Sequence, residues 1–447
     1  MFSFHFTMSF SRNVIGVTAF LVLMNFIGNA QNKKTIQNAD LKTLINYALE
    51  NQPAVKQAAL NEEITRLQIK NKIADWYPQV NAAYNYQRNF QLPVSIIGGN
   101  PVRFGVYNTS SVQLTGTQNI FNRDALLASR TKNDITTVAA KQAENVRITL
   151  IANVSKSYYD LLATHQQLKV TNENIALLQR SFKDARAKYD AGIVDKTDYQ
   201  RATIALNNAN ASRKEIEEAL KAKTASLKYL INYPADETLT LVQDSLVLEH
   251  EVFLDTLQAL DFAQRVEYQT LQARLRLQEA NVSYNKWSFI PSLSANGAYI
   301  HNFQNDHFSD LYNHSYPNSY AALSLSFPIF QGGKRKNNIL IAQRQVTQAK
   351  LDITDFENRA NNEFETAMSE YRANMANYIA LKENMDLAAD VFRVIELQYR
   401  EGIKTYLELI TAQTDLRTSQ INYFNAVYGL LSSKIDVLRA EGAIKPE

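Results

Sequence analysis

Four short segments of the chain alternate between apolar and polar positions. In the first, the even positions from Val80 to Phe90 are mostly apolar or aromatic, whereas the odd positions from Asn81 to Gln91 are mostly amides. Successive side chains of a β-strand point to opposite faces, so this period of two predicts a strand with one apolar and one polar face. The pattern predicts four strands, at about 79–92, 109–121, 291–304 and 318–330.

Each predicted strand runs for about ten residues, the length that crosses an outer membrane as part of a barrel. The alternative is four half-buried strands of a soluble sheet. Aromatic residues at the segment ends favour the membrane, because aromatic girdles flank the apolar band of such barrels. These residues are Trp76, Tyr77, Phe90, Phe121, Trp287, Phe289, Phe303 and Phe330. The residues expected to face lipid are Val112, Leu114, Tyr299, Leu323 and Leu325, with Ser324 and Asn296 on the opposite face.

Two much longer segments carry helical patterns. Residues 122–233 contain no proline and a single glycine, Gly192, and residues 334–428 contain no proline and a single glycine, Gly402. An uninterrupted helix leading to either glycine would be roughly 100 Å long at 1.5 Å per residue. A glycine just past a helix supplies the left-handed residue that closes it. We therefore predict two pairs of antiparallel helices, each turning at one glycine.

The helices after both turns carry heptad-spaced seams in which large residues alternate with small ones. The second seam contains Leu409, Leu416, Tyr423 and Leu430, with Ala412, Ser419 and Ala426 between them. The first contains Tyr199, Leu206, Leu220 and Leu227, interrupted by Arg213, with Ala202, Ala209 and Ile216. This repeat predicts close, coiled-coil-like packing.

The two halves of the chain repeat one order of elements: helix, strand, loop, strand, long helix, turn and shorter helix. The residues 10 and 14 positions after Gly192 are Ala202 and Leu206, and alanine and leucine recur at the same intervals after Gly402. The repetition indicates an internal duplication. We divide the chain into residues 1–30, a first repeat over 31–233, a connection over 234–254, a second repeat over 255–440 and a tail over 441–447. Helices are expected over 40–75 and 255–287, ahead of the strands.

Residues 1–30 have the features of a secretory signal peptide. Arg12 precedes an apolar run from Val14 to Ile27, and small residues follow at the cleavage positions. The run is too short to span a bilayer as a helix, although an N-terminal membrane anchor is the alternative. The chain has 47 Lys and Arg against 44 Asp and Glu, a net charge of +3 that indicates no nucleic-acid partner. Cysteine is absent, which excludes disulfides, thiolate metal sites and a catalytic thiol.

The sequence contains no recognisable catalytic constellation. There is no glycine-rich phosphate loop, no Gly-x-Ser-x-Gly elbow and no His-Glu-x-x-His pair. We expect no enzymatic activity, no cofactor and no bound metal. His301, His307 and His314 fall in or beside one loop, and we interpret them as polar residues of a surface loop, with a metal site as the alternative.

Four strands cannot close a barrel on their own, and open sheet edges are not tolerated in lipid. Two copies of the chain would supply eight strands, whose interior is filled by side chains, whereas three copies would supply twelve and leave room for water. The geometry therefore favours a homotrimer.

The order of elements, the duplication, the paired Tyr-x-x-Gly turns and the seams resemble the TolC-like outer-membrane efflux family over residues 31–447. The resemblance implies an α+β membrane protein in the outer membrane of a Gram-negative bacterium. Its trimeric 12-stranded barrel would continue into a long helical barrel in the periplasm. Such a protein is an exit duct for small molecules or polypeptides that docks to a periplasmic adaptor and an inner-membrane transporter, in efflux or type I secretion. The competing hypothesis is a periplasmic coiled-coil adaptor without a transmembrane barrel.

The resemblance also implies a gate at the two turns. In that family an arginine two residues past the second glycine pairs with an aspartate six residues past the first, and a tyrosine three before the second glycine joins the link. Those positions are Lys404, Asp198 and Tyr399 here. The link is expected to be weaker than in the family, because lysine lacks the bidentate fork of arginine.

The family also carries an acidic ring six and nine residues past the second glycine. Those positions are Glu408 and Thr411 in this chain, so the ring keeps one carboxylate per copy. We expect a closed tip with Glu408 as its negative constriction. The turns themselves, at Gly192, Ile193, Gly402 and Ile403, are the expected docking surface for the adaptor.

Overall fold

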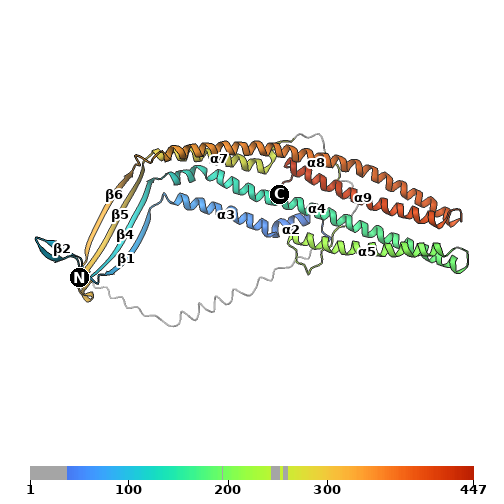
Figure 1. The fold of residues 1–447 in the computed structure, drawn as a ribbon, viewed down its shortest axis with the longest axis horizontal. Helices are drawn as coiled ribbons and strands as arrows, with labels where there is room; N and C mark the ends of the chain where they lie inside the picture. Colours follow the sequence, from blue (N-terminus) through green and yellow to red (C-terminus); the bar gives the residue numbers. More distant parts are fainter. Residues whose placement is uncertain (1–37, 194, 243–251, 255–259, 447) are drawn as a thin grey trace.

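The computed structural model describes residues 38–193, 195–242, 252–254 and 260–446. The chain is long and narrow, with a sheet at one end and helices that run from it to two tight turns at the other (Figure 1). The helices α4 (Arg123–Asp190) and α8 (Lys334–Arg400) span most of this length, with 68 and 67 residues. At 1.5 Å per residue each is about 100 Å long, as the sequence predicted.

Each long helix packs against two shorter helices, one along each half of its length (Figure 1). The four shorter helices are α3 (Pro53–Ala74) and α5 (Lys196–Ile231) beside α4, and α7 (Val266–Lys286) and α9 (Tyr406–Glu441) beside α8. In the structure α4 and α8 end just before Gly192 and Gly402, the glycines at which the sequence predicts turns. No described helix is both long enough and apolar enough to span a lipid bilayer.

The helix expected over residues 40–75 is broken in two. The first piece, α2 (Leu41–Asn51), is capped by Asp40, whose carboxylate accepts a hydrogen bond from the backbone N–H of Thr43. It ends before Pro53, which occupies the first position of α3. Proline lacks the N–H that a continuing helix needs, so the chain restarts there.

Four strands form one antiparallel sheet in the order β1-β4-β5-β6. They are β1 (Gln79–Arg88), β4 (Asn108–Phe121), β5 (Ser292–Asn305) and β6 (Tyr316–Ser326). The two halves of the chain meet at the β4–β5 pair, where Leu114 lies opposite Tyr299. The sequence pattern placed the end of the last strand at residue 330, but β6 ends at Ser326. Pro328 limits the strand, because it has no N–H to donate to a neighbouring strand.

The segment between β1 and β4, which the predicted order of elements makes a loop, contains a small hairpin of β2 (Val94–Ile97) and β3 (Asn100–Arg103). Its turn is formed by Gly98 and Gly99, whose φ angles are 61° and 87°. A two-residue hairpin turn with positive φ at both positions favours glycine, so this pair of glycines was the available signal.

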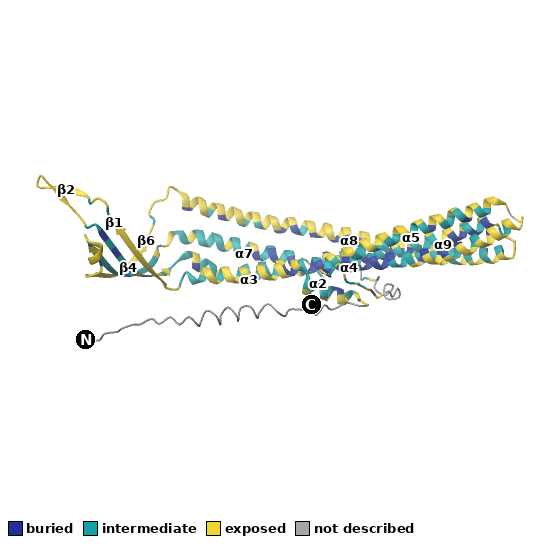
Figure 2. Cartoon of the chain, turned by 90° about the horizontal axis from the view of Figure 1, so that it is seen from below, coloured by how far each residue is buried: buried dark blue, intermediate teal, exposed yellow. Residues whose placement is uncertain are grey.

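The main core lies midway along the helices, where α2, α4, α5, α8 and α9 converge (Figure 2). Its fully buried side chains include Leu44, Val154, Leu161, Leu227, Ile231, Tyr371, Leu430 and Leu431. The connection between the halves is anchored here, by a parallel bridge between Ala39 and Leu241 and by the Tyr371 hydroxyl, which donates to the carbonyl of Val252 at 2.9 Å. Burying one leucine side chain stabilises the fold by about 1.5–3 kcal/mol.

The predicted seam of α9 is largely buried. Leu409, Tyr423, Leu430, Ala412 and Ala426 are each at most 6% exposed. Leu416 and Ser419 are half-buried. The alternation of large and small residues lets α9 pack closely on α8, as expected for coiled-coil-like contacts.

Candidate functional site

The candidate site is the tip, by which we mean residues 182–193, 195–202 and 392–410. Both turns close in the same way. The N–H of Ile193 donates to the carbonyl of Lys188 at 2.9 Å, and the N–H of Ile403 donates to the carbonyl of Gln398 at 2.9 Å. The preceding glycines have φ angles of 71° and 74°. This is the Schellman arrangement, in which glycine takes the left-handed position that other residues occupy only with strain.

The second turn leads into a capping box. The hydroxyl of Thr405 accepts from the N–H of Glu408 at 3.3 Å, and the Glu408 carboxylate accepts from the N–H of Thr405 at 2.9 Å. The ammonium of Lys404 donates to the same carboxylate at 2.6 Å. The hydrogen bond from Lys404, followed by those from Thr405, lowers the pKa of Glu408 to about 2. Glu408 is therefore ionised at neutral pH, with its charge partly compensated by its own chain.

The first turn is capped more weakly. Asp195 caps α5 through one hydrogen bond from the N–H of Thr197, at 3.4 Å. Asp198 lies in the first turn of the same helix and is half-buried. Both carboxylates sit where the dipole of α5 favours negative charge.

The two hairpins contact each other through Lys188 and Tyr399. The Lys188 ammonium donates to the Tyr399 hydroxyl at 3.4 Å and lies 4.6 Å from the centre of its ring. A cation over an aromatic ring is attracted by the negative face of the ring. This contact joins the end of α4 to the end of α8.

A small core lies beneath this contact. Its buried members are Ala185, Ala202, Tyr406 and Leu409, one from α4, one from α5 and two from α9, packed against Phe182, Phe392, Ile395, Tyr399 and Ile410. Tyr406 is 3% exposed, and no described group bonds its hydroxyl. Burial, with smaller contributions from Tyr399 and Asp198, raises the pKa of Tyr406 to about 12. A buried polar group without a partner costs about 1–3 kcal/mol, so the packing around this tyrosine must offset that cost.

The structure brings the four predicted gate residues, Asp198, Tyr399, Lys404 and Glu408, to one end of the molecule. Within the described part of the chain Lys404 forms no ion pair with Asp198, and its ammonium pairs instead with Glu408, four residues later. Asp198 is instead near Tyr406, and Tyr399 contacts Lys188. The exposed large apolar residues of the turns are Ile193, at 73%, and Ile403, at 70%.

Sequence reasoning missed three residues of the tip. Thr405 and Glu408 match the capping-box spacing of a threonine followed three residues later by a glutamate, so this signal was present. Lys188 and Tyr406 had no local signal, since their partners come from other helices.

A second functional surface lies on the sheet, whose two faces differ sharply. Residues directly opposite each other on neighbouring strands share a face. Leu114 of β4 lies opposite Ala82 of β1 and opposite Tyr299 of β5. Tyr299 in turn lies opposite Ser319 of β6, which is on the same face of its strand as Leu323. By this register all five residues expected to face lipid, Val112, Leu114, Tyr299, Leu323 and Leu325, lie on one face.

The opposite face is polar. Asn296 and Ser324 lie there, as expected, and the Asn296 amide donates to the Ser324 hydroxyl at 3.0 Å. The apolar face is not covered by the described residues, since Leu323 and Leu325 have exposed fractions of 74% and 67%.

The three histidines near the loop between β5 and β6 do not converge. The ring Nδ1 of His301 lies 2.7 Å from the hydroxyl of Ser315. Across the residues that the structure describes, no group of three or more His, Asp or Glu side chains could hold a metal ion. His307 and His314 are exposed loop residues.

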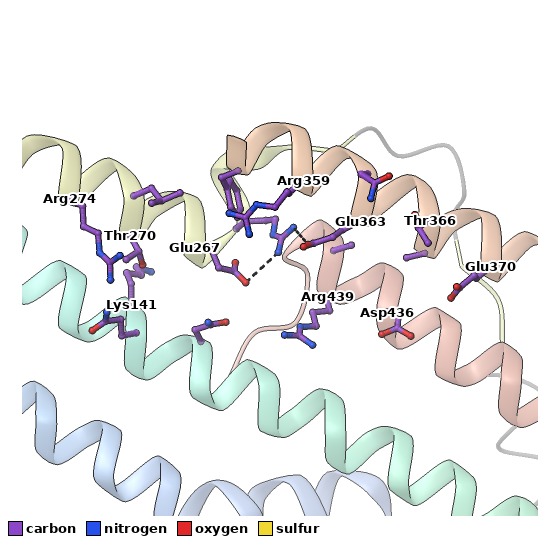
Figure 3. Close-up of a pocket in the computed structure, with 18 residues that line it drawn as sticks. Lys141, Glu267, Thr270, Arg274, Arg359, Glu363, Thr366, Glu370, Asp436 and Arg439 are labelled. Atoms are coloured by element: carbon purple, nitrogen blue, oxygen red, sulfur yellow. Dashed lines mark hydrogen bonds and ion pairs between the residues drawn. The ribbon is translucent and has the colours of Figure 1, made fainter. Parts of the chain in front are cut away.

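A cavity of about 730 Å³ lies between α4, α7, α8 and α9. Figure 3 shows Glu267 and Glu363 joined to one guanidinium group, that of Arg265, at 3.4 and 2.8 Å. Its lining mixes cations such as Arg274 and Arg439 with carboxylates. These opposite charges form an ion-pair network, so the cavity favours neither an anionic nor a cationic ligand.

Comparison with known proteins assigns the chain to a family. The family model described as "Outer membrane efflux protein" matches residues 44–232 and 262–443. The chain belongs to the outer membrane efflux protein family. Its two matched segments are the two halves that flank the connection near the main core. The family places the protein in the outer membrane and decides against the alternative of a periplasmic adaptor.

Curated relatives agree along nearly the whole chain. Outer membrane protein OprJ of Pseudomonas aeruginosa is 23% identical over 416 residues, which cover 92% of this chain and 85% of OprJ. Cation efflux system protein CusC of Escherichia coli K12 is 24% identical over 439 residues, with 94% and 91% covered. Outer membrane protein TolC of Vibrio cholerae is 20% identical over 414 residues, with 91% and 92% covered.

Solved structures show the same fold. A crystal structure of CusC matches with a TM-score of 0.74 at 19% identity, covering 93% of this chain and 95% of that one. The open state of the MtrE outer membrane channel of Neisseria gonorrhoeae matches with a TM-score of 0.68 at 20% identity, covering 90% and 88%. The chain is thus an efflux channel protein of the outer membrane, and its relatives are transport proteins rather than enzymes.

Proposed function

We propose that three copies of this chain assemble into a duct that carries solutes across the outer membrane. Each copy contributes four strands to a closed 12-stranded barrel, and its helices contribute to a tunnel in the periplasm. The duct exports small molecules or polypeptides delivered by an inner-membrane transporter through a periplasmic adaptor. The relatives called CusC are named for cation efflux, whereas the cargo of this chain is selected by its pump partner.

The observation that carries the proposal is the exposed apolar face of the sheet. Large side chains such as Leu114 and Leu323 are more than half exposed on it. In water an apolar face of this kind would promote aggregation, whereas in a membrane it is covered by the acyl chains of the lipid. Strands β1 and β6 each have one partner among the described strands, so both edges of the sheet are open. Lipid does not tolerate open edges, and pairing β6 of one copy with β1 of the next closes the ring.

We propose further that the tip is the gate of the duct. The Lys188–Tyr399 contact holds the two hairpins of one copy together, and opening by movement of one hairpin requires that it break. The ammonium of Lys404 has three donors and Glu408 uses one of them, so a link from Lys404 to Asp198 can form between neighbouring copies. Such half-exposed pairs contribute only about 0–1 kcal/mol each, so the small core around Leu409 supplies most of the closure.

The constriction of this gate is the ring of Glu408 carboxylates, each partly neutralised by its own Lys404. Like charges around an axis attract cations and repel anions. The exposed turns at Gly192, Ile193, Gly402 and Ile403 extend beyond the gate and offer the adaptor two apolar contacts per copy, Ile193 and Ile403.

The test is the purified protein in a planar lipid bilayer, with the mass of the detergent-extracted protein measured alongside. A trimeric mass and discrete conductance steps are expected. Lys404→Ala with Tyr399→Phe should raise the conductance, and Glu408→Ala should lower the cation preference. A native protein recovered as a monomer from the periplasm without detergent would refute the proposal.

A further inference from the structure

The polar face of the sheet carries no charged side chain. By the strand register this face holds the odd positions of β1 and β4 as far as Asn119, together with the even positions of β5 and β6. Amides and hydroxyls dominate it, such as those of Gln79, Asn81, Thr115, Asn296, Asn318 and Ser324. Among the four strands of the described sheet, Arg88 is the single Lys, Arg, Asp or Glu, and the register places it on the apolar face, at the end of β1.

This composition differs from that of the rest of the chain. Charged residues make up 20% of the sequence, so a solvated face of this size would ordinarily hold several of them. The tip holds Lys188, Asp198, Lys404 and Glu408 within a few helical turns. Water solubility alone therefore does not account for a polar surface built from neutral groups only.

We propose that the outer-membrane section of the duct has a lumen without fixed charge, which passes polar solutes of either sign and leaves selection by charge to the periplasmic part. This rests on the proposed function, because the polar face lines a lumen only if the sheet closes into a barrel. Amides and hydroxyls both donate and accept hydrogen bonds. The wall can therefore replace hydration water for neutral, cationic and anionic cargo alike, and it discriminates by size.

The local contacts show that the wall is ordered. The Asn296 amide bridges to the Ser324 hydroxyl on the neighbouring strand. Asn296→Asp keeps the shape of the side chain and adds one carboxylate per copy, to which the Ser324 hydroxyl can donate. Asn296→Lys adds a positive charge at the same place. Each substitution introduces the first fixed charge on this face.

The experiment measures the reversal potential of single channels of the full-length protein under a tenfold KCl gradient. A ring of three charges, screened over about 10 Å at 0.1 M salt, should change the ratio of cation to anion permeability by roughly two- to fourfold. Asn296→Asp should raise the ratio and Asn296→Lys should lower it by a similar factor. Shifts in opposite directions are expected when Asn296 faces the lumen, and their comparable size is expected when no other fixed charge of the wall lies nearby.

Ser319 supplies the matched control. It lies on the same strand as Ser324 but on the apolar face, opposite Tyr299. Ser319→Asp and Ser319→Lys should leave the reversal potential unchanged. The inference is overturned if the Asn296 variants leave the potential of a conducting channel unchanged, or if both shift it in one direction. Failure of the wild-type protein to form channels would instead refute the proposed function.

Discussion

The two ends of this chain solve the burial of apolar side chains in different ways. At the tip, Tyr406 and Leu409 are 3% and 5% exposed, and the residues that cover them belong to the same chain. At the sheet, Leu323 and Leu325 are 74% and 67% exposed, and the described chain does not cover them. The core of the tip is therefore complete within one copy, whereas the sheet requires the lipid and the neighbouring copies that we propose. Each prediction below tests one side of this contrast.

The largest effect is expected from truncation of the core of the tip. Leu409→Ala should destabilise the tip by about 2–5 kcal/mol, because it removes a buried side chain and leaves a cavity. Limited proteolysis of the detergent-solubilised protein, followed over time, would report local opening at the turns. Leu407, 49% exposed on the same helix, is the matched control, and Leu407→Ala should change little. Equal protection of both variants would show that the tip is not held by this core.

The next effect concerns the lipid face. Leu114→Arg should cost about 2–4 kcal/mol, since a charge near the middle of the apolar band is transferred into lipid. Gln113→Arg, one residue away and on the polar face, should be mild. The measurement is the yield of trimer that resists dissociation in heated detergent. The contrast between the two ends would be lost if both substitutions reduced the yield equally.

Much of this architecture could be predicted from the sequence, and the reasons are local. The alternation around Tyr84 and Leu323 fixes the strands and their faces, and the sparse glycines fix both turns. The pairing of Lys404 with Glu408 was missed although its four-residue spacing is a local signal, because the resemblance had supplied Asp198 as the partner. The contact of Lys188 with Tyr399 joins residues 211 apart in sequence, which no local pattern reveals.

A smaller effect is expected at the glycines. Gly402→Ala places a Cβ at φ 74° and should cost about 1–2 kcal/mol, because the left-handed region is unfavourable for other residues. Gly192→Ala, at 71°, should cost about as much. Gly116 in the sheet has no positive φ, and an added Cβ meets nothing within 4 Å. Thermal unfolding of the three variants in detergent should therefore leave Gly116→Ala unchanged.

The smallest effect is a dependence on pH that the tip should show and the sheet should not. The folded pKa of Glu408 is about 2, below the ordinary value of 4.5, so its contribution to stability is present above pH 4.5 and is lost as the pH falls toward 2. Amide exchange at the start of α9 should accelerate over this range. Glu408→Gln should remove the dependence, and exchange in the sheet, whose strands contain no carboxylate, should not follow it. Exchange at α9 that is identical in both proteins would contradict the assigned cap.

The most direct measurement of the central claim uses the absence of cysteine from the chain. Leu323→Cys and Ser324→Cys place one thiol on either face of β6, at adjacent positions. A charged, membrane-impermeant thiol reagent is then added to each variant while single channels conduct in a bilayer. Ser324→Cys should be modified and its conductance should fall, whereas Leu323→Cys should not react. Reaction of both thiols at similar rates, or of the one at Leu323 alone, would contradict a sheet whose apolar face meets lipid and whose polar face lines the duct.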